Sequence, residues 1–290
     1  VFEYRRKIAM VFQEPLLFNS TIFGNVASGL VFRGVSQQDV KRAVMDNLAR
    51  FGIDHLAHRS ARTLSGGEAQ RTSLARAFAV GPEVLFLDEP MSALDSPTRE
   101  SLIADLEEAL KARKITTIFA THDRMEALRL SRRIAVMTGG RIIQEGPPAE
   151  IMNHPESEFV AAFMGVETIL EGVVSAKKDG LLVVATSGQF IEALGDAAEN
   201  EKVLLCIRPE DVLISRHLAT KQTSARNIFS ATVSKLLPMG AYHKVVLDCG
   251  FPLVAFVTNQ SSAELGLGEG TSVTASCKAT AIHVIRRPAL

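Results

Sequence analysis

The sequence places two adjacent carboxylates, Asp88 and Glu89, directly after four apolar residues, Val84 to Leu87, and before Pro90. A short apolar run of this kind is typical of a buried strand, and open α/β sheets bind ligands at the carboxyl ends of their strands. A carboxylate there can hold the magnesium ion of a nucleotide, and its neighbour can polarise a water molecule for attack on the γ-phosphate. On this scheme Asp88 serves Mg²⁺ and Glu89 is the general base, although the pair alone also fits a solvated turn.

A Ser-Gly-Gly sequence, Ser65, Gly66 and Gly67, opens a predicted helix that runs to about Val80. Two glycines at a helix N-terminus leave backbone N–H groups and the helix dipole free to face a phosphate. Because Glu68 follows Ser65 by three residues, the same segment also fits an ordinary capping box. The sequence does not separate these two interpretations.

Two further polar residues follow predicted strands. Gln13 follows the apolar run from Ile8 to Phe12, and His122 follows the predicted strand from Thr116 to Ala120. A lone histidine in such a place is more often a satisfied structural residue than a ligand. The predicted strands alternate with predicted helices, which include 96–113 and 124–131, and this alternation predicts a parallel sheet.

The rest of the chain shows two further sequence patterns, one helical and one typical of β-strands. Between Ser20 and Arg62, apolar residues recur at helical spacing and glycines interrupt them, which predicts a helical subdomain over about 19–63. After Gly165, short β-branched runs between turn residues predict a small all-β domain. Within it, the stretches from Gly172 to Ser175 and from Ala231 to Ser234 are weakly alike, which suggests a duplicated half-barrel.

The composition argues against several classes of protein. The 290 residues hold 32 Lys and Arg against 32 Asp and Glu, so the charge balance gives no support to a nucleic-acid-binding protein. The three cysteines are widely spaced, which suggests neither a zinc site nor a disulfide framework and fits a reducing cytoplasm. No apolar run approaches the roughly 20 residues needed to span a bilayer, so a membrane role is expected to run through partners.

From Ile8 to about Gly165 the chain resembles an ABC transporter ATPase. Five motifs occur in the family's order: the Q-loop at Gln13, the signature motif at Leu64 to Gln70, Walker B at Val84 to Pro90, the D-loop with Asp95, and the switch histidine His122. The resemblance implies a P-loop NTPase-like α/β domain over 1–165, incomplete in this sequence, with a parallel sheet and a helical subdomain.

The same resemblance implies roles for these residues in a head-to-tail homodimer with ATP and Mg²⁺ as cofactors. The signature residues Ser65, Gly66, Gly67 and Glu68 of one subunit are expected to close over ATP held by the other. Glu89, His122 and Gln13 are expected to be catalytic, with Asp88 and Gln13 serving Mg²⁺. Gln13 is also expected to pass the state of the γ-phosphate to Leu16–Gly34, which resembles the surface that contacts a transmembrane permease subunit.

The domain over 166–290 resembles the OB-like TOBE type, with Ile207 to Val212 as the recognisable stretch. Thr223 to Asn227 and Cys277 to Thr280 are similar to the ligand-contacting segments of Mop modules, which bind molybdate and tungstate. The oxyanion-binding candidates are Ser224, Arg226, Lys278 and Thr280. Arg226 could offer parallel N–H donors, Lys278 a point charge, and the two hydroxyls neutral donors. Alternatively, Arg226 and Lys278 are only exposed loop side chains, and Asn227 terminates a turn.

Taken together, the resemblance implies the ATP-hydrolysing subunit of an importer for an oxyanion, tungstate or molybdate, with feedback regulation by that oxyanion. Expected partners are the permease, an extracytoplasmic oxyanion-binding protein reached through it, and a second copy of the chain, on the cytoplasmic face of the membrane. One alternative is an ATPase-incompetent cytosolic oxyanion sensor. Another is an ABC-type ATPase for a different cargo or for DNA maintenance, although the long heptad repeats of the latter are absent.

One departure from the family's pattern generates a prediction. No glycine in the chain is followed by lysine, so the Walker A motif G-x-x-x-x-G-K-[ST] is absent. We interpret residues 1–11 as a strand that arrives from elsewhere and the start as truncated. This chain alone is expected neither to bind ATP with useful affinity nor to hydrolyse it, as measured by nucleotide-binding calorimetry and phosphate release. The intact gene product should do both, and a full-length protein without ATPase activity would contradict this expectation.

Overall fold

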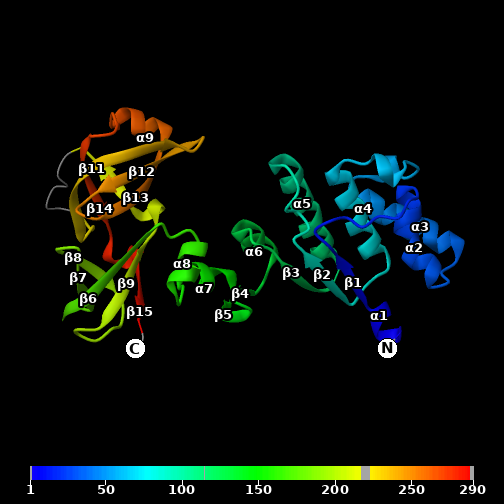
Figure 1. The fold of residues 1–290 in the computed structure, drawn as a ribbon, viewed down its shortest axis with the longest axis horizontal. Coiled ribbons are helices and arrows are strands. Elements are labelled where there is room, and N and C mark those ends of the chain that lie inside the picture. The colour runs from blue at the N-terminus through cyan, green and yellow to red at the C-terminus, as the bar shows by residue number, and fades with distance from the viewer. Residues whose placement is uncertain (1, 114, 217–222, 288–290) are drawn as a thin grey trace. The chain divides into compact units, whose positions relative to one another are not determined.

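The computed structural model describes residues 2–113, 115–216 and 223–287. The chain divides into two compact units, Val1–Arg132 and Arg133–Leu290 (Figure 1). This division falls before the sequence-based domain boundary at residue 165, so residues 133–165 group with the second unit. Within the described residues, no helix is both long enough and apolar enough to cross a bilayer.

A three-stranded parallel sheet forms the centre of the first unit, in the order β1 (Ile8–Val11), β2 (Val84–Asp88) and β3 (Thr116–Ala120). The predicted parallel sheet is therefore confirmed. The prediction of a strand over residues 1–11 is wrong for Phe2–Arg6, which form helix α1, while Val1 lies outside the described residues. An acidic residue in the first turn of α1 and two basic residues in its last turn complement the helix dipole.

One face of this sheet packs against helix α4 (Gly66–Ala79), which contacts β1. The helices α2 (Ile22–Phe32) and α3 (Gln37–Arg50) pack in turn against α4, with two short 3₁₀ turns, Asp54–Leu56 and Ala61–Thr63, between α3 and α4. Their apolar side chains share one core with the sheet residues Leu85 and Leu87. The helices α5 (Ser96–Ala112) and α6 (Arg124–Leu130) follow β2 and β3. The sheet and its helices therefore share one apolar core.

The opposite face of the sheet is more open. Met10, Phe86 and Ile118 lie opposite one another across β1, β2 and β3. Met10 and Ile118 are 44% and 55% exposed. Parallel sheets are usually buried on both faces, so this apolar row lacks the packing layer that such a sheet normally has among the described residues.

The second unit begins with a hairpin and two short helices. The hairpin is formed by β4 (Ile134–Thr138) and β5 (Arg141–Gly146), and the helices are α7 (Pro148–Asn153) and α8 (Glu158–Phe163). Two antiparallel five-stranded sheets follow (Figure 1). The predicted all-β domain is confirmed.

The two sheets are built by duplication with an exchanged strand. The first half runs through β6 (Thr168–Lys178), β7 (Leu181–Thr186), β8 (Gln189–Leu194), β9 (Lys202–Ile207), a 3₁₀ turn and β10 (Leu213–Ser215). The second half repeats this order through β11 (Asn227–Pro238), β12 (Tyr242–Asp248), β13 (Pro252–Thr258), α9 (Asn259–Glu264), β14 (Ser272–Cys277), a 3₁₀ turn and β15 (Ile282–Arg286). The last strand of each half pairs in the sheet of the other half, β10 with β14 and β15 with β9. The halves therefore fold as one unit.

The weak internal similarity of the sequence corresponds to a repeated structural detail. The long strands β6 and β11 each carry a β-bulge, after Val174 and Val233 respectively. At each bulge a serine hydroxyl donates to a backbone carbonyl of the neighbouring strand, Ser175 to Val183 and Ser234 to Val246, both at 2.9 Å. The suggested duplication is thus confirmed by topology and by local contacts.

The first residue of each long strand ties the two sheets together. The Val254 N–H donates to Thr168 Oγ1 at 3.0 Å. At the equivalent place, Asn227 accepts from the Glu192 N–H and donates to the Glu192 carbonyl, each at 2.8 Å. Asn227 is buried and makes two sheet-to-sheet hydrogen bonds, so it does more than terminate a turn.

The three cysteines lie in this unit as free, buried thiols. Burial raises the pKa of Cys206 and of Cys249 to about 12, and that of Cys277 to about 11. These thiols are therefore protonated at neutral pH and behave as small apolar side chains.

The Asn227 contacts predict a stability effect. Asn227→Ala leaves the partly buried N–H and carbonyl of Glu192 without their side-chain partner, which should lower the free energy of unfolding by roughly 2–4 kcal/mol. Asn259→Ala is the matched control, because this exposed asparagine makes one bond, to the Gly240 carbonyl at 2.7 Å, and should cost less than about 1 kcal/mol. Urea unfolding followed by circular dichroism measures both, and equal losses would contradict the assigned role of Asn227.

Candidate active site

The ends of β2 and β3 bring together two candidate residues that are far apart in the sequence. Asp88 lies opposite Ala120, and the Glu89 N–H donates to the Ala120 carbonyl at 2.9 Å. This pairing places His122 Nδ1 3.0 Å from Glu89 Oε1. At this distance the imidazole and the carboxylate share a direct hydrogen bond, which orients the two side chains relative to each other.

Glu89 has a strained backbone. Its φ is +42°, a region that residues with a β-carbon rarely adopt. Backbone contacts on both sides hold it there, because its N–H is bonded to Ala120 and its carbonyl accepts from the Ser92 hydroxyl at 3.0 Å. Strain of this kind is typical of functional sites, where a side chain must point in one direction.

Electrostatics couples the pair. The hydrogen bond to the Glu89 carboxylate is the largest of the effects that raise the pKa of His122 above its ordinary 6.5, and the charge of Glu89 adds to it. Glu126, which is 3% exposed, has its pKa raised by burial, and Thr121 donates to it at 2.7 Å. The loop that carries His122 is therefore fixed by a buried carboxyl group.

The two residues expected to serve magnesium follow neighbouring strands. Asp88 is exposed at the carboxyl end of β2, and Gln13 is exposed two residues after β1, which pairs with β2. Mg²⁺ is usually bound by one or two protein oxygens together with phosphate oxygens and waters. A carboxylate and a side-chain amide, both exposed and both following the carboxyl ends of paired strands, are ligand types that this ion accepts.

The segment with Gln13 is anchored to α4 by two side chains. Gln70 donates to the Phe12 carbonyl at 3.3 Å, and Arg76 donates to the Leu16 carbonyl at 2.7 Å. Burial lowers the pKa of Arg76, whose guanidinium also lies over the Phe18 ring at 5.8 Å. The helix that begins with Ser65 thus holds the backbone on both sides of Gln13.

At the start of α4, the structure shows a capping box, which was one of the two interpretations that the sequence allowed. The Glu68 N–H donates to Ser65 Oγ at 3.3 Å, and the Ser65 N–H donates to Glu68 Oε2 at 2.7 Å. A β-carbon added at Gly67 would lie 2.6 Å from Thr98 Cγ2, whereas nothing lies near Gly66. Glycine at 67 is therefore required by close packing, and glycine at 66 leaves the helix end open.

Glu68 is an anion at this helix N-terminus. The hydrogen bond from the Ser65 N–H is the first cause that lowers the pKa of Glu68, and Arg59 pairs with the same carboxylate at 3.1 Å. A negative group in this position is stabilised by the helix dipole. The arrangement shows that this end of α4 accommodates an anion.

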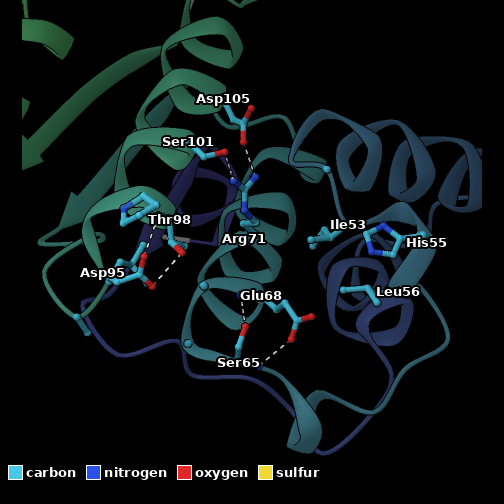
Figure 2. A pocket seen from close by; sticks show the side chains of 16 residues that line it. Ile53, His55, Leu56, Ser65, Glu68, Arg71, Asp95, Thr98, Ser101 and Asp105 are labelled. Atoms are coloured by element: carbon cyan, nitrogen blue, oxygen red, sulfur yellow. Dashed lines mark hydrogen bonds and ion pairs between the residues drawn. The ribbon is translucent and has the colours of Figure 1, made fainter.

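The capped end of α4 faces a cavity of about 760 Å³. Ser65 and Glu68 come from the start of α4, and Asp95 and Thr98 come from the start of α5 (Figure 2). Thr98 donates to Asp95 through its N–H and its hydroxyl, both at 3.0 Å, and these bonds lower the pKa of Asp95. The signature and D-loop candidates therefore share one cavity.

The structure does not place all candidates in that cavity. Glu89 and His122 line a second, much smaller cavity with Ser92, Arg99, Thr121, Asp123 and Glu126. Arg99 was missed from the sequence, because an arginine in the first turn of a helix carries no motif. The signature and D-loop candidates and the Glu89–His122 pair therefore line two different cavities.

The oxyanion candidates lie at one end of a sheet in the second unit. Asn227 pairs with Cys277 across β11 and β14, so the residues just beyond, Arg226 and Lys278, leave the same sheet end. Arg226 is 62% exposed and lies 3.7 Å from Glu192. Lys278 is exposed and has no ionic partner among the described residues, and Ser224 and Thr280 are exposed nearby in the sequence. The predicted cations are therefore brought together.

Comparisons with known proteins agree with these features. A family model described as ABC transporter matches residues 2–92, and one described as TOBE domain matches residues 223–284. The molybdate/tungstate import ATP-binding protein of Pyrococcus horikoshii is 40% identical over 282 residues, which cover 97% of this chain and 79% of that protein. The protein of the same description from Pyrococcus abyssi is 38% identical over 287 residues, which again cover 97% of this chain and 79% of that protein. The spermidine/putrescine import ATP-binding protein of Borreliella afzelii is 36% identical, covering 84% and 68%.

The His122–Glu89 pair predicts a titration result. Glu89→Gln should lower the pKa of His122, because it removes the main cause of the upward shift, while Asp123→Asn should lower it less. Because the folded-state pKa is raised, any stability from the pair is present below pH 6.5 and is lost as the pH rises through the folded value. NMR titration of the His122 ring measures the shift. An unchanged His122 pKa in Glu89→Gln would show that the pair does not form in solution.

Proposed function

This chain belongs to the ABC transporter family as an import ATP-binding subunit, and on that basis we propose that it energises the uptake of a tetrahedral oxyanion, tungstate or molybdate. A transport ATPase of this family works with a membrane permease. We place the chain at the cytoplasmic face of that permease, as a peripheral homodimer that receives substrate through an extracytoplasmic oxyanion-binding protein.

The proposed hydrolytic step rests on the 3.0 Å contact between His122 and Glu89. Glu89 accepts the proton of the attacking water, and His122 orients Glu89 and contacts the γ-phosphate. Bound Mg²⁺ would neutralise charge on the phosphates, with Asp88 and Gln13 as its protein ligands. The strained backbone of Glu89 supports this role, since it fixes the direction of the carboxylate.

The signature residues act on the nucleotide of the opposite subunit in this proposal. Ser65, Gly66 and Gly67 present the N-terminus of α4 to the γ-phosphate, and Asp95 lies across the same cavity. Two contacts of α4 with the segment around Gln13, through Gln70 and Arg76, support a mechanical link to the surface over Leu16–Gly34 that we assign to the permease. Closure at the nucleotide would then move that surface.

The choice of an oxyanion rests on the exposed cations of the second unit. Arg226 and Lys278 leave one sheet end, and Ser224 and Thr280 add hydroxyl donors, a set that suits a tetrahedral dianion. A polyamine, which the Borreliella afzelii relative is named for, would be repelled there. We propose that the imported oxyanion binds at this end and inhibits further uptake when it is plentiful. An ATPase-incompetent oxyanion sensor is the alternative.

Calorimetry on this chain tests the oxyanion assignment. Tungstate, molybdate and sulfate are titrated into the unchanged protein and into Arg226→Ala and Lys278→Ala. Removing one charged donor should weaken tungstate or molybdate binding by roughly 10- to 100-fold, as expected for a charge-assisted hydrogen bond worth about 1.5–3 kcal/mol. Sulfate, which is smaller, should bind less tightly.

Lys235→Ala is the matched control, because Lys235 is an exposed cation on the same strand β11 but away from the proposed site. It should bind as the unchanged protein does. No binding of any of the three anions would leave an ABC importer subunit with a different cargo. Equal weakening in Lys235→Ala would indicate general charge attraction rather than a site.

A further inference from the structure

Arg99 joins the two loops that carry the candidate catalytic residues. It lies in the first turn of α5, and its Nη2 donates to the Leu94 carbonyl at 3.1 Å. Its Nη1 lies 3.6 Å from Asp123 Oδ2, and its Nε is buried without a partner among the described residues. One guanidinium is thus shared between the residue before Asp95 and the residue after His122.

Asp123 is firmly held, so its position determines that of His122. Its Oδ1 accepts from the Met125 and Glu126 N–H groups at 2.8 and 3.3 Å and caps α6. Its own N–H donates to Thr121 Oγ1 at 3.0 Å. The residues on both sides of His122 therefore have fixed contacts, and a shift of Asp123 shifts the imidazole.

The contacts close into a ring. The Glu89 carbonyl accepts a hydrogen bond from Ser92, and the chain continues from there to Leu94. Arg99 links the Leu94 carbonyl to Asp123. His122, which precedes Asp123, contacts the Glu89 carboxylate and completes the ring. Among the residues that the structure describes, Arg99 is also the only guanidinium lining the small cavity of Glu89 and His122, beside the carboxylates of Asp123 and Glu126. Removing Arg99 would remove the guanidinium charge beside these carboxylates and would open the ring.

We propose that Arg99 is a positioning residue that transmits movement of the Leu94–Asp95 segment to the His122–Glu89 pair. This inference rests on the proposed function, in which Asp95 faces a cavity closed by the opposite subunit. When that subunit closes, the Leu94 carbonyl moves, and the guanidinium carries the displacement to Asp123. Arginine suits this role because its planar group can bond a carbonyl and a carboxylate at once, whereas the single ammonium of lysine cannot match that geometry.

Steady-state ATP hydrolysis by the complete gene product tests the inference. Arg99→Gln should lower kcat by roughly 10- to 100-fold, as expected when catalytic groups are misplaced by about 1 Å, with KM for ATP unchanged. Arg99→Lys should show the same low kcat as Arg99→Gln. Arg113→Gln is the matched control, because Arg113 donates to the Phe78 carbonyl at 2.7 Å from the other end of α5, and kcat should stay as in the unchanged protein.

A second measurement does not require ATP turnover. In this 290-residue chain, the NMR signals of the His122 ring in Arg99→Gln should move toward those of Glu89→Gln, and Arg113→Gln should leave them in place. Full activity in Arg99→Lys, or unmoved His122 signals in Arg99→Gln, would overturn the inference. A fall in kcat that is fully explained by a lower Tm would also overturn the inference, since Arg99 would then only stabilise the fold. Absence of ATPase activity in the unchanged gene product would instead refute the proposed function.

Discussion

The pairing of β2 with β3 is the constraint on which the candidate hydrolytic site depends. Asp88 is the last residue of β2 and lies opposite Ala120, the last residue of β3. The final hydrogen bond between the two strands runs from the Glu89 N–H to the Ala120 carbonyl. The chain must turn away at once, and Glu89 takes a left-handed backbone conformation that costs on the order of 1–3 kcal/mol. The packed core around Leu85 and Leu87 supplies the stability that tolerates this cost. As a result, the Glu89 carboxylate contacts His122.

Much of this arrangement could be predicted from the sequence, because it follows from simple patterns. Buried parallel strands read as continuous apolar runs, and the predicted strand Thr116–Ala120 matches β3 at both ends. The carboxyl ends of neighbouring parallel strands lie together, so a carboxylate after one strand and a histidine after the next are expected to meet. The capping box at Ser65 was equally visible, because it depends on residue types at fixed spacing.

Other features left no such signal. Arg76 and Arg99 act through backbone carbonyls of Leu16 and Leu94, and a carbonyl acceptor is present at every residue, so nothing in the sequence marks the partner. Helix α1 was missed because five residues are too few to show a helical period. The exchange of β10 and β15 between the sheets depends on contacts between strands far apart in the chain, which local patterns do not record.

Duplication gives the second unit two equivalent strand ends, and their side chains decide which can receive an anion. Arg208 and Lys278 each precede a 3₁₀ turn at corresponding places. Arg208 is only 14% exposed, donates to the carbonyls of Met152 and Met164, and lies 3.7 Å from Glu210, so it holds α7 and α8 against the barrel. Lys278 makes no such contact among the described residues and stays exposed. An anion at the first end would have to displace the hydrogen bonds that Arg208 makes, whereas at the second end it would meet an accessible charge, which makes the second end the electrostatically favourable one.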